Sequence, residues 1–496
     1  MNNLIVLPLL IPLCTGIVLI FLKERVEWQR MLSAISMLLN VGVAAWVVLA
    51  VKRDGIQTLN MGGWEAPYGI VFVADMLAAL LVLTTTVISA VCLFYAFSSI
   101  GEQRERHYFY SFLQFLIVGV IGSFLTGDIF NLFVCFEIML ISSYALIVLG
   151  GRKAQLRESL KYILVNIVSS ILFVASVAYL YAVVGTLNMA DMSVRVAEVG
   201  QGGILTVIAI LFLFVFSLKA GLFLFFWLPG SYSAPPAAIT ALFAGLLTKV
   251  GVYAIIRVFT LIFYHEPHIT HSLIGWMAAL TMIAGVLGAV AYQDVNRILI
   301  YNIVYAVGFI AFGLSIANED AIQGTIFYLF QDMIVKSLLF LLGGAIVLAA
   351  GTDRLKNMGG LIRRYPAMGW MFFIAALAVV GVPPLSGFIG KLLILRGGLG
   401  DEQFWISGIS LAGSLVLLYA VMNMFMKAFW GAERMPETNK AASAQPSLKA
   451  LLIPAGVLLA LVVYVGIGAE TILPYVSQAA ETLLNPDLYI EAVLKE

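Results

Sequence analysis

Charged residues are scarce in this sequence. Asp, Glu, Lys and Arg together make up 11% of the 496 residues, hydrophobic residues make up 62%, and the mean hydropathy is +1.02. Soluble globular domains carry about 25% charged residues, so the composition excludes a soluble protein and predicts a polytopic membrane protein. No basic stretch is interleaved with aromatic residues, and a nucleic-acid partner is therefore not expected.

Cysteine and nucleotide-binding motifs are nearly or wholly missing. Cys14, Cys92 and Cys135 lie inside apolar segments and form no CxxC pair, so disulfides, iron–sulfur clusters and thiolate zinc sites are not expected. Gly-rich phosphate loops, GxSxG elbows and HExxH pairs are absent. The sequence thus predicts no cofactor, no metal site and no enzyme. Energy for any transport must come from an ion gradient or a partner.

What the sequence has in abundance is long apolar runs. A run of about 18 residues or more is long enough to be a transmembrane helix. The fold class expected is therefore an all-α polytopic membrane protein with about 14 transmembrane helices, the first of them retained and not cleaved as a signal peptide. The runs lie approximately at 3–22, 30–51, 70–98, 108–126, 128–150, 162–184, 203–228, 236–264, 273–292, 297–316, 322–349, 367–395, 404–430 and 449–473.

Two of these runs, the seventh and the twelfth, contain helix breakers. Gly221 and a proline cluster interrupt helix 7, and Pro383 with Pro384 interrupts helix 12. Interrupted helices at matching positions mark the pathway in inverted-repeat transporters, and a lysine accompanies each break. We therefore expect two inverted five-helix repeats. The predicted segments are 1–107 (helices 1–3), 108–264 (helices 4–8), 265–430 (helices 9–13) and 431–496 (a linker and helix 14).

The charge of the loops predicts the orientation in the membrane. Odd-numbered loops carry 18 Lys and Arg residues, and even-numbered loops carry 4. By the positive-inside rule, odd loops are cytoplasmic and both termini lie outside.

Several charged side chains interrupt the apolar runs. A cation at the bilayer centre costs about 2.5–3.5 kcal/mol even on the lenient insertion scale, so each needs a reason. Lysine changes its protonation state readily when it is buried, and a row of lysines opposed by a carboxylate can pass protons. The sequence therefore predicts an ion-translocating membrane protein. The candidate residues are Glu137, Lys219, Lys249, Lys336 and Lys391.

Other charged residues in the runs have simpler interpretations. Asp332 and Lys336 are four residues apart, so they can pair within one helix. Glu137 could form a static ion pair that only joins two helices. Arg257 is expected to snorkel to the headgroups, and Asp75 to cap or pack as readily as to conduct.

Three of the four histidines lie in one tract, at His265, His268 and His271. Such a tract could bind a metal or sense pH. Pro267 argues against one continuous helical face that presents all three, and a solvated outer loop is the favoured interpretation.

Three motifs carry a resemblance to a known family. Residues 217–221 with 227–229, 234–237 and 249–253 form the first, residues 381–388 with Lys391 the second, and Phe136-Glu137 with residues 142–144 the third. Together they resemble the antiporter-like subunits of respiratory complex I, membrane-bound hydrogenases and Mrp-type cation/proton antiporters. The resemblance covers essentially the whole chain.

Within this family the sequence is most similar to the D-type subunits of Mrp Na⁺/H⁺ antiporters. The resemblance implies a fourteen-helix inverted-repeat fold, Glu137–Lys219 as the coupling pair, and Lys249, Lys336 and Lys391 as the relay. It also implies a bacterial inner membrane location, other integral membrane subunits as partners, and H⁺ and Na⁺ as transported ions.

The sequence departs from the family pattern at two positions. Asp332 stands where members often have a histidine four residues before the helix-11 lysine, and Ala306 stands at a helix-10 histidine position. The resemblance therefore implies a central route that uses water, Asp332 or hydroxyl groups such as those of Tyr301 and Tyr305.

Two alternatives stay open at this point. The chain could be a proton-pumping membrane subunit of a redox complex similar to complex I or a hydrogenase, or a scaffold that anchors partners without conducting. In either antiporter or redox complex, an ammonium-lined path repels a bare cation, so we expect Na⁺ to cross elsewhere in the assembly.

Overall fold

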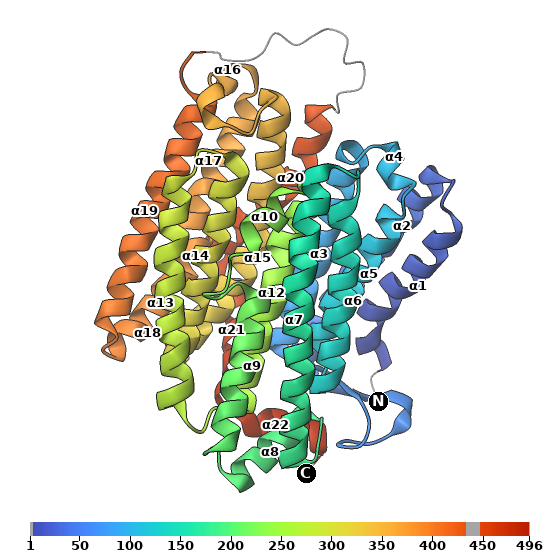
Figure 1. The fold of residues 1–496 in the computed structure, drawn as a ribbon, viewed down its shortest axis with the longest axis vertical. Helices are drawn as coiled ribbons and strands as arrows, with labels where there is room; N and C mark the ends of the chain where they lie inside the picture. Colours follow the sequence, from blue (N-terminus) through green and yellow to red (C-terminus); the bar gives the residue numbers. More distant parts are fainter. Residues whose placement is uncertain (1–2, 433–446, 496) are drawn as a thin grey trace.

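The computed structural model describes residues 3–432 and 447–495, which form a bundle of helices that run mostly along one axis (Figure 1). Eleven of the described helical segments are long and apolar enough to cross a membrane, and three shorter apolar helices accompany them. Each of the fourteen predicted runs overlaps one of these segments, while the number of actual crossings stays a prediction. The long segments are α1 with its first turn (Asn3–Phe21), α2 (Val26–Asp54), α3 (Met76–Ser99), α6 (Ile129–Val148), α7 (Lys153–Val184), α11 to α12 (Ala237–Leu261), α13 (Pro267–Ala291), α14 (Val295–Ile316), α15 (Glu319–Ala350), α19 (Phe404–Phe429) and α20 (Leu448–Ile467); the shorter ones are α5 (Phe109–Leu125), α9 (Ile204–Ala220) and α17 (Pro366–Val380).

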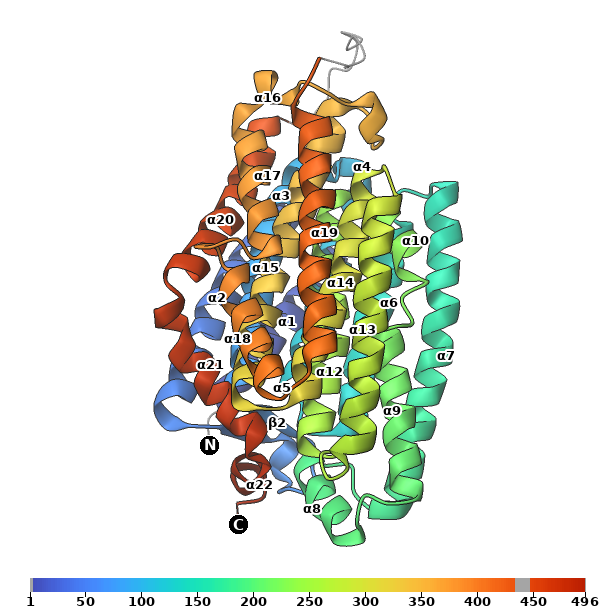
Figure 2. The same ribbon diagram turned by 90° about the vertical axis from the view of Figure 1, so that its left-hand side faces the viewer.

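Short elements connect these segments. Most lie at the two ends of the bundle, and α10 and α18 lie within it (Figures 1 and 2). They are the helices α4 (Glu102–Glu105), α8 (Met189–Val199), α10 (Leu228–Ser233), α16 (Leu361–Arg364), α18 (Gly387–Gly400), α21 (Ala469–Leu484) and α22 (Pro486–Leu494), the turns η1 (Asn3–Val6), η2 (Met61–Gly63), η3 (Phe243–Leu247) and η4 (Leu355–Asn357), and the strands β1 (Gln57–Asn60) and β2 (Val71–Ala74).

The third helix begins later than predicted. Residues 71–74 form β2, which pairs antiparallel with β1 in the register Gln57↔Ala74, and the predicted helix start at 70 is therefore wrong. Two of these residues are β-branched and favour a strand. Asp75 then caps α3 by accepting a hydrogen bond from the Ala78 amide at 2.8 Å.

Both predicted helix breaks are present. The chain leaves α9 at Gly221 in a left-handed conformation (φ 77°) and leaves α17 at Gly381 (φ 90°). Glycine adopts this conformation without the clash that a Cβ would cause. Because Pro384 has no N–H, the carbonyl of Val380 also loses its normal helical partner, and the helix cannot continue.

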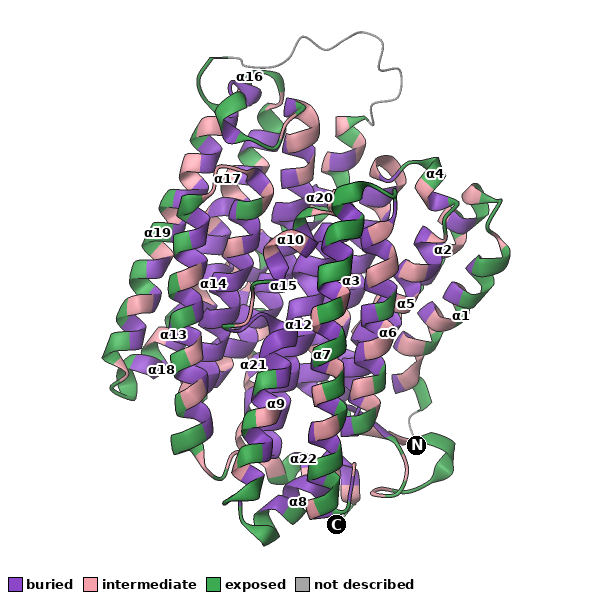
Figure 3. Cartoon of the chain, in the orientation of Figure 1, coloured by how far each residue is buried: buried purple, intermediate pink, exposed green. Residues whose placement is uncertain are grey.

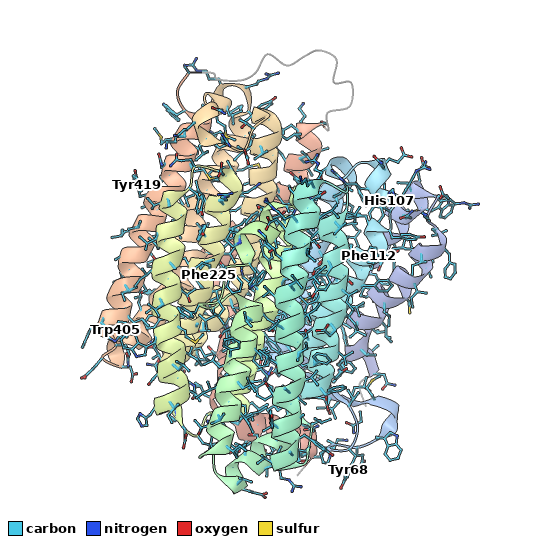
Figure 4. The ribbon with its side chains drawn as sticks, in the orientation of Figure 1. Tyr68, His107, Phe112, Phe225, Trp405 and Tyr419 are labelled. Carbon is cyan, nitrogen blue, oxygen red and sulfur yellow. The ribbon has the colours of Figure 1, made fainter. Side chains whose placement is uncertain are left out.

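The centre of the bundle is made by α12 and α15, which are buried along almost their whole length (Figure 3). Helices α7 and α19 lie at the periphery and carry an exposed face (Figures 2 and 3). Trp405 and Tyr419 mark that face on α19 (Figure 4). The two ends of the described chain lie at the same end of the bundle (Figure 1).

The last predicted helix is longer than its apolar run. The chain bends at Gly468 and continues as α21, which is amphipathic and packs on α15 and α3. Gly466 lies against the backbone of the α17–α18 break, since a Cβ there would be 2.4 Å from the Pro384 carbonyl oxygen. The predicted linker at Glu433–Lys449 lies mostly outside the described residues.

Candidate functional site

Glu137 and Lys219 meet through a third residue. Ser170 on α7 donates a hydrogen bond to Glu137 Oε1, and Lys219 Nζ donates to Ser170 Oγ at 3.4 Å. Within the described residues no direct ion pair joins Glu137 to Lys219. The ammonium group also lies 5.0 Å from the centre of the Phe136 ring, a favourable cation–π distance.

The break after α9 places Lys219 at the last turn of a helix. The carbonyl of Leu218 accepts a hydrogen bond from the Trp227 indole at 2.9 Å, which replaces a lost backbone partner. Lys219 itself is buried. The break therefore fixes a cation inside the bundle.

Lys249, Asp332 and Lys336 form a central cluster. Lys249 Nζ lies 2.9 Å from Asp332 Oδ2, and Lys336 Nζ lies 3.2 Å from Asp332 Oδ1. All three side chains are at most 1% exposed. One carboxylate thus serves two ammonium groups in a site closed to water, and the cluster has one more positive than negative charge.

The intrahelical pairing of Asp332 with Lys336 is confirmed, and the contact of Asp332 with Lys249 is new. Lys336 also bonds Asn302 Oδ1 on α14, a residue that sequence reasoning missed. An asparagine inside an apolar run was the available signal.

A local π-turn, η3, brings Lys249 into this cluster. Residues 243–247 form a π-helical turn just before α12 begins. Such turns shift the helix register by one residue and often occur at functional sites. Lys249 Nζ donates to the Ala244 carbonyl at 3.0 Å, so the lysine side chain folds back onto that turn.

Lys391 lies beside the second break. Its ammonium group donates to the Val380 carbonyl at 2.8 Å, the same carbonyl that Pro384 leaves without a helical donor. It also donates to Ser414 Oγ on α19 at 3.0 Å. Three rings surround it at centroid distances between 5.5 and 5.9 Å, those of Tyr305, Phe309 and Tyr328.

The two tyrosines that sequence reasoning offered as relays lie in different surroundings. Tyr305 bonds Ser414 Oγ at 2.8 Å and is therefore part of the Lys391 cluster. Tyr301 stacks on Tyr292 and contacts Phe225, which lies near the mid-height of the bundle (Figure 4). No hydrogen bond between Tyr301 and any of the five site residues is present in the described part of the chain.

Arg257 does not snorkel to the headgroups, so that interpretation is wrong. It is buried and pairs with Asp75 at 2.5 Å, between the rings of Tyr253 and Tyr489. Asp75 is the cap of α3, as one of its predicted roles required. The pair therefore joins α12, α3 and the C-terminal helix α22.

The histidine tract is not one solvated loop. His271 is buried within α13, whereas His265 precedes that helix and is partly covered, which lowers the pKa of its imidazole. Pro267 is the first residue of α13, so the three histidines share no continuous helical face. Among the described residues no group of three His, Cys, Asp or Glu side chains is arranged to hold a metal ion.

Comparison with known proteins decides the family. Residues 126–416 match the model of the family described as NADH:quinone oxidoreductase/Mrp antiporter, transmembrane. The chain belongs to this family. It is 55% identical to the D-type subunit of the Na(+)/H(+) antiporter of Bacillus subtilis (strain 168) and 49% identical to that of Alkalihalophilus pseudofirmus, in both cases over 100% of each chain.

Solved structures agree with the family assignment. A chain of the Mrp complex from Dietzia sp. DQ12-45-1b has a TM-score of 0.92 and 28% identity, with 100% of both chains covered. A chain of the membrane-bound sulfane sulfur reductase, an archaeal respiratory membrane complex, has a TM-score of 0.89 and 28% identity, with 99% of both covered. Respiratory complex I from Thermus thermophilus shares the fold, with a TM-score of 0.81 over 97% of this chain and 100% of that chain at 24% identity.

Proposed function

We propose that this protein is the proton-translocating D-type subunit of a multisubunit Na⁺/H⁺ antiporter. Its relatives carry that name over their full length. The route we propose uses Glu137, Lys219, Lys249, Lys336 and Lys391, with Asp332 and Tyr305 as intermediate groups. Tyr301 would serve only through water.

The observation that carries this proposal is the central cluster. A carboxylate shared by Lys249 and Lys336 lets one ammonium group give up its proton while the other keeps a counter-charge. Two ammonium groups with one carboxylate would be a poor device for stability alone, because buried ions lose much hydration energy. Lys219 and Lys391 lie beside the two broken helices, and in the proposed inverted repeats these breaks admit protons from opposite faces.

The proposal includes an orientation with both termini outside the bacterial inner membrane, supported by the loop charges and by the common position of the two chain ends (Figure 1). We expect Na⁺ to cross elsewhere in the complex, because the ammonium groups of the route repel a bare cation.

The surroundings of Glu137 support a neighbouring subunit at this face. Glu137 is only partly buried in the isolated chain, and Val134 and Ile141 on the same helix are exposed. A carboxylate that faced lipid would carry a high energetic cost. Another membrane protein of the complex, packed over α6, would remove this cost.

The test is cation-dependent proton movement in everted vesicles from antiporter-deficient cells that express all subunits. We expect Glu137→Ala, Lys219→Ala and Lys391→Ala each to abolish Na⁺-dependent pH recovery while the complex still assembles. Normal recovery in all three would contradict the proposal and favour a scaffold role.

A second candidate is a proton-pumping membrane subunit of a redox complex, favoured by the likeness to the sulfane sulfur reductase chain. Purification of the native complex separates the two. Flavin or iron–sulfur absorbance in the purified complex would support the redox candidate.

A further inference from the structure

Each lysine beside a broken helix donates a hydrogen bond to a serine hydroxyl on another helix. Lys219 Nζ bonds Ser170 Oγ on α7, and Lys391 Nζ bonds Ser414 Oγ on α19. Neither serine belongs to the three family motifs of the sequence. Single serines in membrane helices usually bond a carbonyl one turn earlier in their own helix, so these two contacts need an explanation.

The hydrogen bonds at Ser170 run in one direction. Lys219 donates to Ser170, and Ser170 donates to Glu137. A proton can therefore pass from the ammonium group to Ser170 Oγ while the serine proton passes to the Glu137 carboxylate. Lys219 becomes a neutral amine, Glu137 becomes a neutral acid, and the serine is regenerated, so atoms and charge balance.

The hydrogen bonds at Ser414 form a second directed chain. Tyr305 donates its single proton to the Ser410 carbonyl at 2.7 Å, so at the 2.8 Å contact between the two hydroxyls Ser414 must be the donor. The order is then Lys391, Ser414, Tyr305. This chain leads from the buried ammonium group to α19 at the periphery of the bundle.

The helix positions of the two serines support a common role. Ser170 lies 17 residues after Lys153, the start of the 32-residue helix α7, and Lys336 lies 17 residues after Glu319, the start of the 32-residue helix α15. In the proposed repeats α7 corresponds to α15, and α12 corresponds to α19. Ser170 and Ser414 thus lie on the two helices whose counterparts carry Lys336 and Lys249.

We infer that Ser170 and Ser414 are hydroxyl bridges through which Lys219 and Lys391 exchange protons with Glu137 and with the periphery of the bundle. This inference rests on the proposed function. It adds two neutral residues to a route otherwise made of charged groups, and it makes a hydroxyl, not a direct ion pair, the link between Glu137 and Lys219.

The experiment compares threonine with valine at each position, because the two side chains have nearly the same shape and differ in the hydroxyl. The full complex is expressed, assembly is checked by the amount of co-purified subunits, and Na⁺-dependent pH recovery is measured in everted vesicles. We expect Ser170→Val and Ser414→Val to lower the initial rate about tenfold, since a water molecule can replace a lost hydroxyl only in part. Ser170→Thr and Ser414→Thr should restore at least half of the wild-type rate.

Ser169 and Ser410 are the matched controls. Both are buried on the same two helices, and their hydroxyls bond only backbone carbonyls, of Val215 and Ser407. Ser169→Ala and Ser410→Ala should leave the rate unchanged. If a valine variant does not assemble, the alanine variant at that position takes its place.

The outcomes separate this inference from the function on which it rests. Glu137→Ala and Lys219→Ala are measured in the same series. Loss of activity in those two variants with wild-type rates in Ser170→Val and Ser414→Val would overturn the hydroxyl bridges and leave the proposed function intact. Equal rates for threonine and valine, both low, would also overturn them, because the hydroxyl would then have no role beyond packing. Wild-type rates in Glu137→Ala and Lys219→Ala would overturn the function itself.

Discussion

Asp332 is the residue on which the central cluster depends. It is the counter-charge for Lys249 and Lys336, and all three are closed to solvent. The family resemblance implied a histidine at this position. A carboxylate here gives the cluster a net charge of one where a neutral histidine would leave two, and this lowers the cost of burying both lysines.

We expect Asp332→Asn to abolish Na⁺-dependent pH recovery and to lower the free energy of unfolding by about 3–5 kcal/mol, because two buried ammonium groups would lose their counter-charge. Vesicle transport measures the first effect, and thermal melting of the purified complex measures the second. Glu319→Gln, on the same helix but exposed, is the control and should change neither.

The Asp75–Arg257 pair is expected to stabilise the fold and not to carry protons. Asp75→Asn keeps an acceptor for the Ala78 amide but leaves Arg257 as a buried unpaired cation, at a cost of about 3–5 kcal/mol. The double change Asp75→Asn with Arg257→Met should melt at a higher temperature than Asp75→Asn alone. A double variant no more stable than that single variant would refute the pairing.

The residues of the site differ in how well the sequence predicts them. A lysine inside an apolar run is conspicuous, because the membrane makes its presence costly. Ser170, Asn302 and Ser414 are not conspicuous, since neutral polar residues in membrane helices commonly bond their own backbone. Spacing revealed the pair of Asp332 with Lys336, which share a helix, but not the contact with Lys249, which depends on how two helices pack.

At the scale of elements, the α17–α18 break is held from two sides. Gln331 on α15 donates to Ser386 Oγ at 3.1 Å, and Gly466 on α20 lies against the backbone of Pro384 and Ser386. Gln331 is the neighbour of Asp332. The break therefore contacts both the central helix and the C-terminal helix.

We expect Gly466→Ala to displace this break and to reduce transport several-fold, because its Cβ would lie 2.4 Å from the Pro384 oxygen and 2.6 Å from the Ser386 nitrogen. Gly456→Ala on the same helix is the control, since the nearest atom to its Cβ is 3.8 Å away. Equal transport in the two variants, at equal assembly, would show that the contact has no functional role.

The elements themselves were largely predictable. Long apolar runs with glycine and proline between them gave the helices and both breaks, because these features follow from hydropathy and backbone chemistry alone. The strand at residues 71–74 was not predictable, since its apolar residues run without interruption into α3. The extension α21 was missed because it is amphipathic and gains its stability from packing on α15 and α3.

At the scale of the whole molecule, the orientation is open to direct test. We expect an impermeant maleimide to label Glu65→Cys, in the exposed β1–β2 hairpin, from outside intact cells, and to label Lys153→Cys only in everted vesicles. Both are made in a chain without its three native cysteines. Labelling of Lys153→Cys in intact cells would reverse the proposed orientation and with it the direction of the route.

The measurement that tests the central claim most directly is Na⁺-dependent pH recovery in everted vesicles that contain the assembled complex with Lys249→Ala. Lys249 is fully buried and joins α12 to the carboxylate of α15, so proton passage through the cluster depends on it. The account predicts no recovery above that of vesicles without the antiporter. Recovery at the wild-type rate would contradict it.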